Sequence, residues 1–303
     1  EEFIFPVLSH LYNEVDRIIV IEGAVVNRPN ATPDGHSTDR TLEIIKDFKA
    51  NHDPLKKVVV VSINKPWKNL EAMKQTFLDL SIPGDVIVIN DADEFYRPQD
   101  IERLRKAIDL YPHVQEWIPT FLHFYHDLYH IAKPGPEWNP FHQRVFKYVR
   151  GMKYVHHPTV YDPAGHDTYF SPQYWHRRYN LNDFFVYHYG YARKDMNTIM
   201  KFKQEYYEKE LAGHDAANKK FDQKVRDWFD NSEPVLTFDG DHPKEIHNMC
   251  ISHENRSLNV VGSWRDDALY NRVLQRQPFG TMWLNQTNQA QPSIPFFHNE
   301  ITI

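Results

Sequence analysis

The chain has 303 residues, of which 41% are hydrophobic, 14% aromatic and 25% charged, as in an ordinary globular protein with a substantial core. Its formal net charge of −6 leaves no broad basic surface, so we expect no nucleic-acid partner. A single cysteine, Cys250, rules out an internal disulfide, and no apolar run reaches the ~20 residues of a membrane helix. We therefore expect a cytoplasmic protein without a transmembrane segment.

Three short apolar runs in the first hundred residues are expected to form strands: RIIVIEG (17–23), KVVVVSI (57–63) and DVIVIND (85–91). None alternates with polar residues, which is typical of strands covered on both faces in a parallel sheet. The two segments between these runs have the apolar spacing of helices. Alternation of strand and helix predicts right-handed crossover units and an α/β fold with a doubly wound, mostly parallel sheet flanked by helices.

The second half of the chain is more aromatic and less regular. Alternation in FLHFYH (121–126) and RVFKYV (144–149) predicts strands, and FFVYHYGY (184–191) is expected to form another. Two helices are expected between residues 196 and 229. The remainder, from about Glu233, is interpreted as an irregular C-terminal extension packed on the same domain.

The third apolar run leads directly into negative charge, because VIVINDADEFY places Asp91, Asp93 and Glu94 within four positions. Carboxylates this close repel one another unless a cation lies among them. Functional loops of such sheets gather at the carboxyl ends of the strands, where this D-x-D loop is expected to lie. Asp91 and Asp93 suit Mg²⁺ or Mn²⁺, which prefer oxygen ligands and share them with substrate phosphates. The alternative is a solvated turn before the helix that begins near Pro98.

The order of these motifs resembles family 2 of the GT-A glycosyltransferases. VDRIIVIEG (15–23) followed by STDRTLEII (37–45) is similar to the family's first acidic strand end and its Ser-x-x-Asp element, although AVVNRPNATPDGH intervenes here. GDVIVINDADEF (84–95) resembles the donor-site strand. RVFKYVRGMKYVHHP (144–158) and YHYGYARKDMNTIMKFKQEYY (187–207) resemble segments of the lipopolysaccharide-core-type members.

This resemblance implies a GT-A fold and a metal-dependent glycosyltransferase. Such an enzyme moves a sugar from a nucleotide-diphosphate donor to a hydroxyl acceptor, such as a glycan or a lipid-linked saccharide, with inversion. Residues 1–110 would bind the donor, residues 111–232 would complete the metal site and bind the acceptor, and residues 233–303 would pack on the same domain. EEFIFPVLSHL (1–11) resembles the helix after the family's first nucleotide-binding strand, which implies that such a strand has been lost from the numbered chain or lies outside it.

The resemblance also implies roles for individual residues. The ligands of Mn²⁺ or Mg²⁺ would be Asp91, Asp93 and His188. The donor would contact Glu22, Asp39, Asp91, Arg193 and Lys201. The candidates for the general base are Asp162 and His157, the latter standing where the family usually has Glu. For His188 the alternative is a hydrogen-bonded core histidine, and for Lys201 a solvated helix face.

Two other functions stay open on the sequence. A nucleotidyltransferase on a similar α/β sheet would need a glycine-rich, basic phosphate-binding loop, whereas EGAVVNRPNATPDG (22–35) holds two glycines and one arginine. A non-catalytic carbohydrate-binding or scaffold protein of the same fold would bind without turnover. The many histidines show no H-E-x-x-H pattern, so they give zinc little support.

Overall fold

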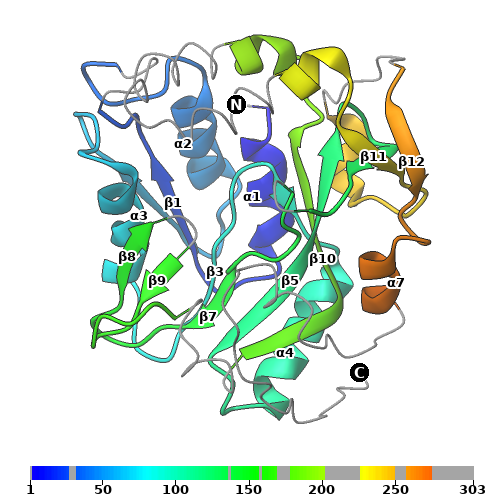
Figure 1. Ribbon diagram of the computed structural model, residues 1–303. Coiled ribbons are helices and arrows are strands. Elements are labelled where there is room, and N and C mark those ends of the chain that lie inside the picture. The colour runs from blue at the N-terminus through cyan, green and yellow to red at the C-terminus, as the bar shows by residue number, and fades with distance from the viewer. Residues whose placement is uncertain are drawn as a thin grey trace.

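The structure is a computed structural model, and the residues that it describes are 2–26, 32–135, 138–156, 159–168, 178–201, 226–249 and 257–274. In Figure 1, the long strands β5 (Glu116–Tyr125) and β10 (Arg178–Tyr191) run through the middle of the molecule. The first strands and helices lie on one side of them, and the C-terminal elements lie on the other.

The first half of the chain has the expected alternation of strand and helix. β1 (Ile18–Glu22) pairs in parallel with β2 (Val58–Ser62). α1 (Ile4–Tyr12) precedes β1, α2 (Thr41–Asn51) connects β1 with β2, and α3 (Leu70–Asp79) follows β2. Because β1 and β2 are parallel, their carboxyl ends bring Glu22 and Ser62 side by side.

Local side-chain chemistry helps to determine where α3 and α4 (Pro98–Leu110) start. Asn69 caps α3, and its Oδ1 accepts a hydrogen bond from the backbone N–H of Ala72 at 2.8 Å. α4 begins with proline, whose fixed φ suits the first helical position, and Asp100 accepts a hydrogen bond from the backbone N–H of Arg97 at 3.2 Å. These starts place α4 directly after the acidic loop.

The large sheet is mixed, so the prediction of a mostly parallel sheet is wrong for it. β5 and β10 are parallel, but β10 is antiparallel to β4, and β7 is antiparallel to both β3 and β5. The sheet runs in the order β12-β11-β6-β5-β10-β4, with β7 and β3 attached beside β5. Its shorter strands are β3 (Val86–Val88), β4 (Glu94–Phe95), β6 (His130–Ala132), β7 (Val145–Lys147), β11 (Pro234–Thr237) and β12 (Asn259–Ser263). An apolar run shows that a strand is covered, but it does not show the direction of its neighbour.

The C-terminal part of the chain is more regular than the sequence suggests. β11 pairs with β6, a 3₁₀ helix spans Lys244–Asn248, and α7 (Ala268–Leu274) packs near β10. The hydroxyl of Tyr270 in α7 donates a hydrogen bond to the backbone oxygen of Phe121 at 3.0 Å. The prediction of an irregular extension is therefore wrong for these segments, which are too short for their periodicity to be read.

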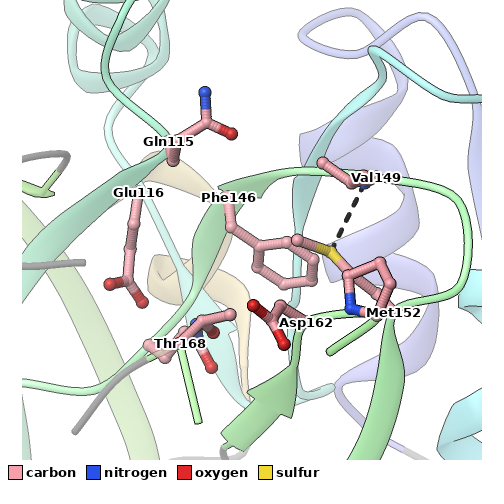
Figure 2. A pocket seen from close by; sticks show the side chains of 9 residues that line it. Gln115, Glu116, Phe146, Val149, Met152, Asp162 and Thr168 are labelled. Carbon is pink, nitrogen blue, oxygen red and sulfur yellow. Dashed lines mark hydrogen bonds between the residues drawn. The ribbon is translucent and has the colours of Figure 1, made fainter. Parts of the chain in front are cut away.

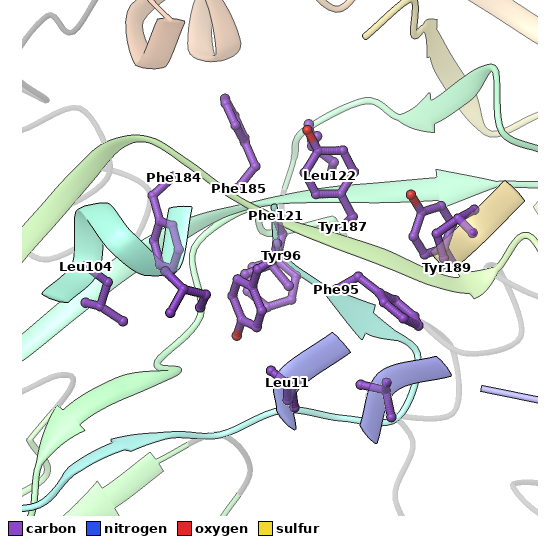
Figure 3. Close-up of a cluster of buried hydrophobic side chains, with 14 of the residues drawn as sticks. Leu11, Phe95, Tyr96, Leu104, Phe121, Leu122, Phe184, Phe185, Tyr187 and Tyr189 are labelled. Atoms are coloured by element: carbon purple, nitrogen blue, oxygen red, sulfur yellow. The ribbon is translucent and has the colours of Figure 1, made fainter. Parts of the chain in front are cut away.

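Aromatic side chains fill the main core. Figure 3 shows Phe95 of β4 between the central strands and Leu11 of α1, while the rings of Tyr187 and Tyr189 of β10 are directed away from Leu11. The Phe124 and Tyr189 rings stack with centroids 4.6 Å apart. Phe95 of β4 contacts the same Tyr189 ring, with centroids 5.9 Å apart, so aromatic packing ties β4 to β10 next to the acidic loop.

A further hairpin, made of β8 (Lys153–His156) and β9 (Thr159–Tyr161), contacts α3. Among the described residues, no helix combines the length and apolar character that crossing a membrane requires.

Candidate active site

The acidic loop and the histidine-bearing strand, which are far apart in the sequence, meet through the pairing of β4 with β10. Glu94 lies opposite His188 in the antiparallel register. The backbone N–H of Tyr189 donates to the backbone oxygen of Asp93 at 2.9 Å. The sheet thus brings together two motifs that the sequence analysis assigned to one metal site.

Asp93 and His188 face each other across a short gap. Asp93 Oδ2 lies 3.6 Å from His188 Nε2, and both side chains are partly exposed, at 26% and 16%. Gly190 borders this gap, and a Cβ at that position would collide with Asp93 Oδ2 and His188 Nε2. The absence of a side chain at Gly190 therefore lets both atoms lie close to the backbone there.

Asp91 and Glu94 are compensated by two cationic side chains. Asp91 Oδ1 lies 3.0 Å from Lys74 Nζ, and its Oδ2 lies 3.3 Å from Arg144 Nη2. Arg144 also donates to both carboxylate oxygens of Glu94, at 2.9 and 2.6 Å. Burial alone would lower the pKa of Arg144, but the Glu94 and Asp91 carboxylates raise it, so the guanidinium stays charged. The repulsion within the acidic cluster is thus relieved by the chain itself for two of its three carboxylates.

Arg193, a predicted donor contact, lies on the same side as Asp93. Its Nε is 2.9 Å from Asp195 Oδ1 and 2.9 Å from Glu2 Oε1. Burial would lower the pKa of Arg193, but the Asp195, Glu2 and Asp93 carboxylates outweigh it and raise the pKa. Lys201, the other predicted cation, is exposed.

Glu22 is buried and saturated with hydrogen bonds. It accepts from the backbone N–H and the hydroxyl of Ser37 at 2.7 and 2.8 Å, and from the Ser62 hydroxyl at 2.8 Å. His36 Nδ1 lies 3.3 Å from its Oε2. Burial would raise the pKa of Glu22, but these hydrogen bonds outweigh it and lower the pKa. Glu22 therefore ties the segment before α2 to the carboxyl ends of β1 and β2.

The remaining predicted residues have local roles in the structure. Asp39 is exposed, and its Oδ1 accepts from the backbone N–H of Thr41 at the start of α2, at 3.0 Å. Asp162 accepts from the backbone N–H of His166 at 2.8 Å, and its Oδ2 lies 3.1 Å from the His166 ring. His157 lies outside the described residues.

Asp162 also lines a cavity of about 160 Å³ (Figure 2). Glu116, Gln143 and Thr168 provide other polar groups, while Phe146 and Met152 provide apolar ones. The strand register places His123, not Glu116, opposite His188. Glu116 and His123 are seven residues apart on β5, so at a rise of about 3.3 Å per residue they lie roughly 23 Å apart. The structure thus places Asp162 at a second concave feature, distinct from the gap between Asp93 and His188.

The Asp93–His188 pair suits a divalent cation only as a partial ligand set. Within the described ranges, no three His, Cys, Asp or Glu side chains form a cluster that could hold a metal ion. Mg²⁺ commonly keeps several waters and binds through one or two carboxylates together with substrate phosphates. One carboxylate and one imidazole, which approach each other where Gly190 has no side chain, fit such a shared site, completed by the substrate.

The sequence motifs do not predict that Lys74, Arg144 and His123 belong to this site. Arg144 opens the RVFKYV segment, whose alternation predicts a strand but not the ion pairs of its first residue. His123 Nδ1 lies 3.0 Å from His188 Nδ1, across the β5–β10 pairing. These partners are brought in by tertiary packing, and the sequence offers no spacing that would reveal them.

Comparison with known proteins gives one match. Residues 33–159 match the family described as glycosyl transferase family 2. The matched segment contains Asp91, Asp93 and Arg144, but it contains neither Glu22 nor His188. No match to the chain was found among curated proteins. The family match supports an α/β fold and glycosyl transfer in general for this segment.

Proposed function

Because residues 33–159 match glycosyl transferase family 2, we propose that the protein is a metal-dependent glycosyltransferase. It would move a sugar from a nucleotide-diphosphate donor to a hydroxyl of a glycan or lipid-linked saccharide, with inversion. The observation that carries this proposal is the approach of Asp93 Oδ2 to His188 Nε2 at 3.6 Å beside Gly190.

In this proposal, Asp93 and His188 hold Mn²⁺ or Mg²⁺. When bound there, the cation supplies charge that stabilises the leaving diphosphate. Asp91 and Glu94 are already compensated by Lys74 and Arg144, so they orient the loop and keep Asp93 directed at the gap. Asp91 would then position the loop or contact the donor, and it would not be a principal metal ligand.

Arg193 would contact the diphosphate. Its guanidinium remains charged, and Asp195 and Glu2 hold its Nε in place near Asp93. Planar guanidinium groups bind phosphate oxygens through two parallel hydrogen bonds. Glu22 would act on the donor through the segment it holds, which includes Ser37 and leads to Asp39. Asp162, predicted as a base, lines the separate cavity beside Glu116, so we assign it no role at the gap between Asp93 and His188.

The test is release of nucleoside diphosphate from a panel of nucleotide sugars, with and without Mn²⁺. The variant is Asp93→Asn, and the matched control is Asp109→Asn, which changes an exposed aspartate of α4. We expect release that requires Mn²⁺ in the wild type, a loss of about 100-fold or more in Asp93→Asn, and no loss in the control.

Two outcomes would replace the proposal. Binding of nucleotide sugars without turnover would favour a non-catalytic carbohydrate-binding protein. Formation of pyrophosphate from a nucleoside triphosphate and a sugar phosphate would favour a nucleotidyltransferase. Turnover that is equal in Asp93→Asn and wild type would remove Asp93 from the site.

A further inference from the structure

We propose that His123 is a positioning residue that fixes the tautomer of His188, so that the unprotonated Nε2 of His188 faces Asp93. The relation to a metal ion rests on the function proposed above. The tautomer itself is a property of the protein without metal, and it can be tested separately.

A backbone oxygen determines which nitrogen of His123 carries the proton. His123 Nε2 lies 3.1 Å from the backbone oxygen of Asn139, and a carbonyl oxygen only accepts hydrogen bonds. The proton must therefore be on His123 Nε2. A neutral imidazole carries one N–H, so His123 Nδ1 presents a lone pair.

His123 and His188 contact each other through their ring nitrogens. His123 Nδ1 and His188 Nδ1 are 3.0 Å apart, which is hydrogen-bond distance. Because His123 Nδ1 is the acceptor, His188 Nδ1 must carry the proton and donate it. In the neutral ring, His188 Nε2 is then left with a lone pair, 3.6 Å from Asp93 Oδ2.

The opposite tautomer of His188 fits the geometry poorly. It would place two nitrogen lone pairs 3.0 Å apart between His188 and His123. Its Nε2–H would lie 3.6 Å from Asp93 Oδ2, which is beyond the usual N–H···O range. The inferred tautomer instead makes one good hydrogen bond and places a lone pair opposite a carboxylate oxygen. Two electron-rich groups so placed are a donor set for a cation.

Packing holds the His123 ring in the required orientation. His123 is only 7% exposed, its ring stacks on Phe121 with centroids 5.3 Å apart, and it lies 5.5 Å from the Trp138 ring. The parallel register places His123 directly opposite His188. Histidines that bind metals almost always donate their second N–H to an acceptor that fixes the ring, and mutation of that acceptor typically costs 10–100-fold in metal affinity. His123 supplies such an acceptor.

The direct test is the protonation state of the His188 ring nitrogens in the metal-free protein. Long-range ¹H–¹⁵N spectra of protein labelled at histidine distinguish a protonated ring nitrogen from a bare one, and a His188→Gln variant identifies the His188 signals. We expect a protonated Nδ1 and a bare Nε2 in the wild type. A proton on Nε2 of neutral His188 would overturn the proposal.

Substitutions at His123 test whether it causes this state. His123→Gln keeps one acceptor and one donor, whereas His123→Phe removes both. His142→Phe is the matched control, because His142 lies beside the same Phe121 ring and its ring centroid is 5.9 Å from that of His123. We expect the His188 tautomer to be kept in His123→Gln and His142→Phe and to become mixed in His123→Phe. An unchanged tautomer in His123→Phe would overturn the proposal.

Mn²⁺ binding provides the second readout, measured by the loss of the free Mn²⁺ signal in electron paramagnetic resonance with uridine diphosphate present. We expect binding about 10–100-fold weaker in His123→Phe and within a few-fold of wild type in His123→Gln. Equal weakening in both variants, with thermal unfolding unchanged, would contradict a positioning role. If the wild type binds no Mn²⁺, the metal in the proposed function is refuted, and the spectra of the metal-free protein alone decide the role of His123.

Discussion

Arg144 donates two hydrogen bonds to the Glu94 carboxylate, from Nε to Oε2 at 2.9 Å and from Nη2 to Oε1 at 2.6 Å. Both side chains are almost completely buried. This buried ion pair includes Glu94, the last of the three carboxylates of the acidic loop. It stabilises the loop only as long as both partners are present, because either charge alone would be left without compensation.

We therefore expect Arg144→Met to destabilise the protein by about 3–5 kcal/mol, since Glu94 would remain buried without its counter-charge. The measurement is the free energy of unfolding in urea. Arg144→Met combined with Glu94→Leu should be less destabilising than the sum of the two single changes. The control is Arg40→Ala, which removes an exposed ion pair with Glu43 and should cost at most about 0.5 kcal/mol. Additive effects of the two buried changes would show that the pair does not act as a unit.

Gly190→Ala tests whether the gap beside Asp93 and His188 is needed. The new methyl group would collide with both side chains, whereas a Cβ at Gly135 would meet nothing within 4 Å. We expect Gly190→Ala to weaken Mn²⁺ binding about tenfold, equivalent to roughly 1.4 kcal/mol. Gly135→Ala should bind as the wild type does. Equal Mn²⁺ affinity in both variants, measured by calorimetry with uridine diphosphate present, would mean that the gap is not the cation site.

Glu22 should make stability depend on acid pH. In the folded state, the pKa of Glu22 lies below its ordinary value of 4.5. Burial would raise this pKa, but the hydrogen bonds from Ser37, Ser62 and His36 outweigh it. A carboxyl group whose pKa is lower in the folded state than in the unfolded state stabilises the protein at pH values above its unfolded-state pKa. This stabilisation is lost as the pH falls through the folded-state pKa. We expect Glu22→Gln to cost about 2 kcal/mol near neutral pH and progressively less below about pH 4.5, by urea unfolding at each pH. Glu43→Gln is the control, since Glu43 is exposed on α2 and should change the profile little.

The sequence predicted the location of the candidate site better than its internal arrangement. The D-x-D loop and the likeness of the VYHYGY segment to a known motif predict one metal site made of Asp91, Asp93 and His188. The structure places Asp93 3.6 Å from His188 but pairs Asp91 with Lys74 and Arg144, and the metal itself stays a prediction. Lys74, Arg144 and His123 were missed as partners. Each comes from a different element, and contact across elements leaves no periodic trace in the sequence.

The same distinction applies to the fold. α1, α2, α3 and α4 follow from apolar spacing, and α3 and α4 also have helix-start residues, all of which are local properties. The direction of β3 was predicted incorrectly because its neighbour is β7, a three-residue strand in the second half of the chain. β4 has only two residues, which is too short for alternation to be detected. Its pairing with β10 nevertheless creates the candidate site.

The position of β11 has a consequence for biosynthesis. Val235 and Leu236 pair with Ala132 and Ile131, so a late segment of the chain covers the outer edge of β6. While the ribosome is still making the intervening residues, that edge has unsatisfied backbone groups and could pair with another nascent chain. The edge of β6 in newly made protein would therefore stay open to such pairing until Val235 and Leu236 are available to cover it.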